Sequence, residues 1–151
     1  MLKWPNDLFV SGMKLAGILV ESSVGENAFA TAGIGLNVNH SCFPAPLDAT
    51  ATSLRLQAGA SLDRNAVAAA ILASIDESFS LIPNHFDQIV NWASHFDYLL
   101  GRRISVGAGV TVHEGIAEGL DFDGALFLRL PSGPVVRITS GEVTRYSKLG
   151  T

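Results

Sequence analysis

The chain contains a single cysteine, Cys42, among 151 residues. One thiol excludes an intrachain disulfide and a structural zinc site built from cysteines. This scarcity of cysteine is typical of proteins that work in a reducing compartment, so we expect a cytoplasmic location.

Long apolar runs and an excess of positive charge are also missing. No apolar run reaches membrane-spanning length, and the first residues show no secretory h-region, so we expect no membrane partner. Ten Lys and Arg stand against 14 Asp and Glu, a formal net charge of −4, which argues against a nucleic-acid partner. The four histidines lack the spacing of metal ligands.

Apolar residues, by contrast, are plentiful. They make up 48% of the chain, and the mean hydropathy of +0.32 is high for a chain with no membrane-spanning run. Either the core is large, or a sizeable apolar face is covered by a partner. The length allows one medium domain, or one sheet-and-helix layer followed by a small barrel.

Polar side chains flank a predicted turn near the start of the chain. Ser11-Gly12 separates a short apolar step at 8–10 from an apolar run at 15–20, which predicts a β-hairpin. The hairpin would bring together two lysines, an amide and a carboxylate: Lys3, Asn6, Asp7 and Lys14. Such a set suits an anionic ligand. Gly17, inside the apolar run, indicates a place where another group approaches the backbone closely.

The pattern beyond this hairpin predicts strands first and helices afterwards. Strands are expected at 8–10, 15–22 and 29–39, with a turn at 25–27, and their near-continuous apolar content predicts cover on both faces. Asp63 is the predicted N-cap of a helix that ends before Pro83. A second helix is expected over 85–96, with Trp92 among its inward-facing residues.

Frequent glycines separate short alternating runs after Leu100. These runs predict five or six strands of a small SH3-like β-barrel, at 104–106, 110–112, 115–117, 125–130, 135–138 and 143–146. We place a domain boundary between residues 97 and 98, with one domain at 1–97 and the barrel at 98–151.

Five motifs, taken in this order, resemble the biotin protein ligases: KWPND at 3–7, KLAGILVE at 14–21, GIGLNVN at 33–39, ATSL at 51–54 and SGEV at 140–143. The resemblance implies an α+β fold, in which part of a class II synthetase-like mixed sheet with two helices precedes an SH3-like barrel. It begins in the middle of the family's catalytic domain. The Gly/Arg-rich loop of type GRGRxGR, which folds over biotin and adenylate in the family, does not occur among these residues.

The resemblance also implies a reaction. Biotin ligases activate the biotin carboxylate with ATP to give biotinyl-5'-AMP, and then transfer biotin to a lysine of a biotin carboxyl carrier protein. The first step brings two anions together and builds charge on the α-phosphate, so it requires a fixed cation and usually Mg²⁺. ATP, Mg²⁺ and biotin are therefore the expected small molecules, and the carrier protein is the expected partner.

Two residues receive the central chemical roles from the resemblance. Lys14 matches the essential lysine, which reaches both the biotin carbonyl region and the phosphate. Asp7 matches the carboxylate associated with magnesium. Alternatives from the residues alone are a solvated charge on a strand edge for Lys14, and a turn residue that satisfies backbone donors for Asp7.

The remaining assignments surround this pair. Lys3, also expected to be catalytic, and Asn6 match residues on the phosphate side. Gly17 and Leu19 match the lining of the biotin pocket, although Leu19 could also be a plain buried strand residue. Asn37 matches the adenine-contacting position, where an amide offers both a donor and an acceptor. Trp4 is expected to pack rather than to contact ligand.

We expect the isolated chain to have little or no ligase activity, because the upstream half of the domain would supply many of the ligand contacts. That missing half is a predicted partner, and a homodimer is another, since an uncovered sheet edge favours self-association. Two other functions stay open: a non-catalytic protein-binding module and a lipoate-ligase-like acyl-adenylate enzyme. The order of the motifs and the terminal barrel favour biotin.

Overall fold

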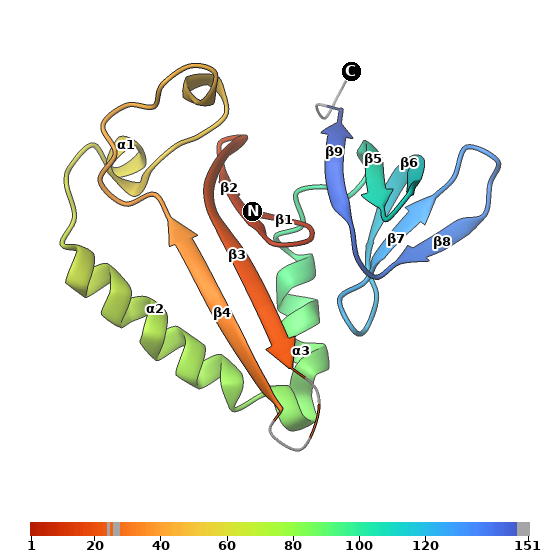
Figure 1. The fold of residues 1–151 in the computed structure, drawn as a ribbon, viewed down its shortest axis with the longest axis horizontal. Helices are drawn as coiled ribbons and strands as arrows, with labels where there is room; N and C mark the ends of the chain where they lie inside the picture. Colours follow the sequence, from red (N-terminus) through yellow and green to blue (C-terminus); the bar gives the residue numbers. More distant parts are fainter. Residues whose placement is uncertain (24, 26–27, 148–151) are drawn as a thin grey trace. The chain divides into compact units, whose positions relative to one another are not determined.

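The computed structural model describes residues 1–23, 25 and 28–147 (Figure 1). Helices and two β-sheets are both present, which confirms the predicted α+β class. The chain divides into two compact units, Asn6–Leu72 and Met1–Pro5 with Ala73–Thr151. The turn predicted at 25–27 lies partly outside the described residues.

The Asn6–Leu72 unit is built on an antiparallel arrangement of the three predicted strands, in which β3 lies between the other two. They are β2 (Asp7–Val10), β3 (Met13–Ser23) and β4 (Phe29–Leu36). A short 3-10 helix and two α-helices follow: η1 (Leu47–Ala49), α1 (Leu54–Ala58) and α2 (Arg64–Phe79), of which residues 64–72 belong to this unit. Asp63 caps α2 as predicted, because its Oδ1 accepts the N–H of Asn65 at 2.8 Å.

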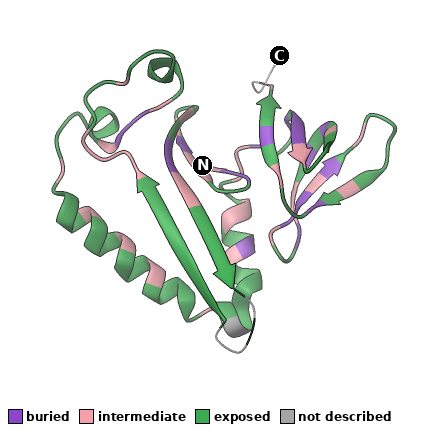
Figure 2. Ribbon diagram, viewed as in Figure 1, coloured by how far each residue is buried: buried purple, intermediate pink, exposed green. Residues whose placement is uncertain are grey.

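The predicted cover on both faces of these strands is wrong for β4. Residues 29–35 are all exposed, and in β3 the side chains of Leu19 and Val20 are 62% and 60% exposed (Figure 2). In these three strands, buried residues occur only at Phe9 on β2, which is 6% exposed, and at the beginning of β3, where Leu15 is 8% and Ala16 is 2% exposed. The high hydropathy of the sequence therefore corresponds to an uncovered apolar strand surface as well as to a core.

The other unit contains a helix, a short N-terminal strand and a five-stranded antiparallel sheet with the order β8-β7-β6-β5-β9. The elements are β1 (Leu2–Lys3), α3 (Ile82–Ser94), β5 (Arg103–Ala108), β6 (Thr111–Leu120), β7 (Leu126–Arg129), β8 (Val135–Ile138) and β9 (Glu142–Tyr146). The runs predicted as separate strands at 110–112 and 115–117 form one strand, β6.

The core of this unit lies on the five-stranded sheet. Leu99, Ile104, Leu126 and Leu128 are at most 1% exposed. Trp4 joins the same cluster, and its Nε1 donates to the carbonyl oxygen of Gly124 at 3.2 Å. The prediction that Trp4 packs is thus confirmed.

The predicted inward orientation of Trp92 on α3 is wrong, since its side chain is 62% exposed. Val90 on the same helix is only 8% exposed. Val90 and Trp92 are two positions apart, which corresponds to a rotation of about 200° around a helix with 3.6 residues per turn. The face of α3 that buries Val90 therefore leaves Trp92 pointing outward. Trp92 packs instead against Phe96, with ring centroids 5.0 Å apart.

Gly115 allows β6 to run uninterrupted past its neighbour. A Cβ at this position would lie 2.2 Å from the backbone oxygen of Arg129 on β7, closer than any real contact. The β6 and β7 backbones therefore approach at a point where only glycine fits.

Replacing Gly115 with alanine is expected to lower the free energy of unfolding by about 3 kcal/mol, because one backbone must move away from the other. The matched control is Gly107→Ala on β5, where a Cβ would meet only the Glu142 oxygen at 3.9 Å. Urea unfolding of both variants provides the measurement. Equal stability of the two variants would contradict the close approach.

Candidate functional site

Strand register brings Asp7 and Gly17 together. The two residues are directly paired across β2 and β3, so their side-chain positions point to the same face of the sheet. A Cβ at Gly17 would lie 3.3 Å from Oδ1 of Asp7. The absence of a side chain at Gly17 therefore leaves room beside the Asp7 carboxylate.

A β-bulge directs Lys14 to this same face. Leu8 pairs with Ala16, but Phe9 pairs with Lys14, so the register passes over Leu15. In regular alternation Lys14 and Gly17, three residues apart, would point to opposite faces. The bulge shifts this alternation by one residue, so Lys14 points to the same face as Gly17. A Cβ at Gly17 would lie 3.3 Å from Nζ of Lys14.

The ammonium of Lys14 and the carboxylate of Asp7 form an ion pair with Nζ and Oδ1 2.5 Å apart. The Lys14 side chain is 47% exposed and that of Asp7 is 14% exposed. Solvent screens such a pair, so it adds little to stability. Its main consequence is geometric, because it holds a partly exposed cation in one orientation above Gly17.

The residues alone allowed a non-catalytic interpretation of both Lys14 and Asp7, and the structure bears on each. Lys14 lies on β3, and its backbone is paired with β2 on one side and bonded to residues 50–52 on the other, so it does not lie on a sheet edge. Asp7 is the first residue of β2, directly after the turn at 4–6, and its carboxylate pairs with Lys14, so a local turn contact is not its whole role.

Asn37 is tied to the same end of the sheet. It directly follows β4, and its backbone N–H donates to the Leu15 oxygen at 3.0 Å. Its side-chain Nδ2 donates to the Thr52 oxygen at 3.1 Å, and the Thr52 N–H donates to the Lys14 oxygen at 2.9 Å. Lys14 and Asn37 are thus bound to one common residue. An amide has two N–H groups and an oxygen, so this bond leaves Asn37 able to pair with a planar ligand.

Next to these polar groups, one face of the sheet carries glycines in place of residues with side chains. Gly17 pairs with Gly35, and Gly33 pairs with Leu19, so all four positions share the face of Asp7. A Cβ at Gly33 or at Gly35 would meet only a backbone oxygen, 3.8 Å away. We call this surface the glycine face, defined by Gly17, Gly33 and Gly35. Leu19 is 62% exposed on it, so the alternative of a plain buried strand residue is wrong.

The two other predicted phosphate-side residues have structural bonds of their own. Asn6 exchanges hydrogen bonds with Ile18. Its side-chain Nδ2 donates to the backbone oxygen of Ile18 at 2.6 Å, and its backbone oxygen accepts the Ile18 N–H at 2.8 Å. Lys3 belongs to the unit of the five-stranded sheet, where it is 8% exposed and its Nζ lies 5.8 Å from the ring centroid of Tyr146.

The described part of the chain holds no group of three or more His, Cys, Asp or Glu side chains that could bind a metal. Magnesium, however, commonly uses one or two protein carboxylates and takes its other ligands from water and substrate phosphates. A single carboxylate at Asp7 fits a magnesium ion that arrives with a nucleotide. It does not fit a site made of protein ligands alone.

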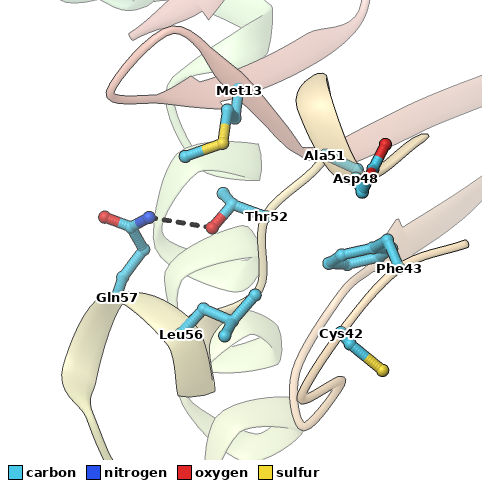
Figure 3. Close-up of a pocket in the computed structure, with 8 residues that line it drawn as sticks. All are labelled: Met13, Cys42, Phe43, Asp48, Ala51, Thr52, Leu56 and Gln57. Atoms are coloured by element: carbon cyan, nitrogen blue, oxygen red, sulfur yellow. Dashed lines mark hydrogen bonds between the residues drawn. The ribbon is translucent and has the colours of Figure 1, made fainter. Parts of the chain in front are cut away.

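A pocket of about 370 Å³ adjoins the site through Thr52 (Figure 3). It is lined by Met13, Cys42, Phe43, Asp48, Ala51, Thr52, Leu56 and Gln57. Nε2 of Gln57 donates to Oγ1 of Thr52 at 2.8 Å. Sequence reasoning assigned no role to Thr52 or Gln57. The signal for Thr52 was its place in the ATSL motif.

Two family models match the sequence, one at each end. Residues 1–39 match the Biotin/lipoate A/B protein ligase family, and residues 99–145 match the Biotin protein ligase C terminal domain. The first range contains Asp7, Lys14, Gly17 and Asn37. The second range contains β5 to β8 and all of β9 except its last residue. No helix within residues 1–23, 25 and 28–147 has the length and apolar content that a membrane span requires.

Curated relatives are similar along most of the chain. The biotin--[acetyl-CoA-carboxylase] ligase of Mycobacterium tuberculosis is 33% identical, over 94% of this chain and 52% of its own length. The bifunctional ligase/repressor BirA of Bacillus subtilis is 34% identical, over 94% of this chain and 45% of its own length. The chain thus spans about half the length of these relatives.

Solved structures are similar as well. A biotin protein ligase from Aquifex aeolicus, determined in complex with biotin and ATP, superimposes with a TM-score of 0.84 at 28% sequence identity. The match covers 97% of this chain and 62% of that protein. The resemblance inferred from the five motifs is confirmed by sequence and by fold.

Proposed function

Because the chain belongs to the biotin protein ligase family, we propose that it forms the part of such a ligase in which Lys14 promotes the attack of biotin on ATP. One observation carries this proposal. An oriented ammonium lies above an open glycine face, and the amide of Asn37 belongs to the same hydrogen-bond network.

In the proposed reaction a carboxylate oxygen of biotin attacks the α-phosphorus of ATP, and pyrophosphate leaves. The Lys14 ammonium lies between the two anions, lowers their repulsion and stabilises the charge that develops on the phosphate oxygens. Asp7 holds that ammonium in position, so little reorganisation is needed when charge appears. Asp7 would also hold Mg²⁺, which supplies further charge neutralisation when it is bound with ATP.

The surrounding residues bind the two substrates. Gly17 and Leu19 contact biotin, since the bare backbone at Gly17 admits the ureido ring and Leu19 offers an exposed apolar side chain. Asn37 pairs with the adenine edge. From the resemblance alone, we also assign Lys3 and Asn6 to the phosphate side of the bound nucleotide.

The second half-reaction transfers the acyl group to a protein. The amine of a lysine on a biotin carboxyl carrier protein attacks the acyl carbon of biotinyl-5'-AMP, and AMP leaves. A lipoate-type reaction would use the same fold. The match of residues 99–145 to the C-terminal domain of biotin ligases favours biotin, and we assign the barrel domain to 98–151, after a catalytic part at 1–97.

We further infer that the chain works in the cytoplasm together with a second polypeptide segment, the remaining half of the ligase domain. The uncovered apolar strands support this inference, since residues 29–35 are exposed and Leu19 and Val20 lie beside them. A second copy of the chain is the other occupant that this surface fits. The isolated chain is expected to have little or no ligase activity.

Pyrophosphate release tests the proposal. The 151-residue chain is assayed with biotin and ATP, alone and after addition of a separately expressed polypeptide that carries the family's Gly/Arg-rich loop. Turnover is expected only in the mixture. Robust turnover by the chain alone would contradict its inactivity. Failure of the chain to bind biotinyl-5'-AMP in a titration would favour a non-catalytic binding module.

A further inference from the structure

We propose that Thr52 and Gln57 are positioning residues that set the placement of Lys14 and Asn37. The proposal rests on the function proposed above. Neither side chain belongs to the glycine face or to its ion pair. Both act through hydrogen bonds that converge on Thr52, where two use its backbone and one uses its hydroxyl.

Thr52 makes a separate bond with each of three partners. Its N–H donates to the Lys14 oxygen at 2.9 Å, and its oxygen accepts Nδ2 of Asn37 at 3.1 Å. Its Oγ1 accepts Nε2 of Gln57 at 2.8 Å. The residue is 1% exposed, so displacement of any one bond is transmitted to the other two rather than absorbed by solvent.

The backbone of Lys14 is bonded to the segment that contains Thr52. The Lys14 N–H donates to the Thr50 oxygen at 2.7 Å, and Lys14 forms a parallel bridge with Ala51. The backbone of the cationic residue is therefore held by residues 50–52 on one side, while its side chain points to Asp7.

Gln57 connects Thr52 to a fixed point. It lies on α1, whose N-cap Ser53 accepts the Leu56 N–H at 3.1 Å and donates to the His40 oxygen at 2.6 Å. Ser53 is fully buried. The short helix is thus anchored at its N-cap, and the Gln57 amide extends from the helix to Thr52 (Figure 3).

Three substitutions separate this role from general packing. Thr52→Val keeps the branched shape and removes the Oγ1 acceptor, whereas Thr52→Ser keeps the hydroxyl. Gln57→Met removes the donor and keeps the length of the side chain. Gln88→Met on α3 is the matched control, because it makes the same exchange at another exposed helix position.

The first measurement uses nuclear magnetic resonance on the whole chain and requires no ligand. In Thr52→Val and Gln57→Met we expect the side-chain amide signal of Asn37 to shift, and amide exchange at Lys14 and Thr52 to rise by about threefold or more. Thr52→Ser and Gln88→Met are expected to match the wild type. Unchanged signals at Lys14 and Asn37 would overturn the proposal. So would faster exchange spread evenly over the unit, since that is the result of a purely structural role.

The second measurement is the affinity for ATP with Mg²⁺. Thr52→Val and Gln57→Met are expected to weaken binding by about tenfold, and Thr52→Ser is expected to restore it. If the wild-type chain binds no ATP while the signals of Asn37 and Lys14 still shift in the variants, the proposed function fails and the positioning contacts stand. If the wild type binds ATP and the variants bind it equally well, the positioning role is wrong.

Discussion

Replacing Lys14 with glutamine is expected to slow formation of biotinyl-5'-AMP by about 10²- to 10³-fold, the usual cost of removing one preorganised group that stabilises transition-state charge. The half-exposed ammonium is oriented by Asp7 above the glycine face, so its loss leaves both reacting anions without a fixed positive partner. Single-turnover pyrophosphate release in the two-polypeptide mixture measures the effect.

A matched control separates this chemistry from loss of charge in general. Arg64→Gln removes one positive charge from an exposed position at the start of α2, and is expected to change the rate less than about twofold. Thermal melting should show both variants folded like the wild type, because a screened ion pair contributes little stability. Equal rates for Lys14→Gln and Arg64→Gln would remove Lys14 from the mechanism.

Replacing Gly35 with valine is expected to weaken binding of biotinyl-5'-AMP by about tenfold or more, without loss of stability. A Cβ at this position meets only the Gly17 oxygen at 3.8 Å, so the fold has room for the side chain. Glycine inside a strand costs about 0.5–1 kcal/mol, and valine should therefore leave the chain as stable as before or more stable. The fold does not itself require a glycine at position 35, and a ligand on the glycine face would explain the absent side chain.

Ala32→Val provides the control for this second prediction. Ala32 is exposed on the same strand, but it lies three residues from Gly35 and so points to the opposite face. The two variants should have similar urea unfolding curves, and only Gly35→Val should lose affinity in a calorimetric titration. If both variants bind equally well, the glycine face is not the ligand surface.

The sequence predicted most of the strands and the two longer helices, because their signals are local, but it predicted neither η1 nor α1. Apolar alternation, a Ser-Gly turn and the Asp63 cap each act within a few residues. Trp92 shows the limit of such reasoning. The apolar residues of α3 allow more than one inward face, and only the burial of Val90 decides which face Trp92 takes.

The candidate site was predicted in residue type but not in geometry. The motifs named Lys14 and Asp7, but strict alternation would place Lys14 and Gly17 on opposite faces. The bulge at Leu15 arises from pairing between β2 and β3, and single-strand periodicity carries no record of it. The role of Thr52 was not predicted for a similar reason, since its bonds to Lys14 and Asn37 join segments distant in sequence.

The exposure of β4 could not be predicted from its composition. The composition of an apolar strand is the same whether the residues that pack against it belong to the same chain or to another polypeptide. Residues 29–35 carry the composition of a covered strand and lie exposed here. The pattern therefore indicates what the strand is suited to bury, and the structure shows that this surface is uncovered.

The most direct test of the central claim is a titration of the isotopically labelled chain with biotinyl-5'-AMP, followed by nuclear magnetic resonance. If Lys14, Asp7 and Asn37 form one binding site, the signals of the Lys14 side chain, the Gly17 and Gly35 backbone and the Asn37 amide should shift together with a single affinity. Shifts confined to other parts of the chain, or no shifts at saturating ligand, would contradict it.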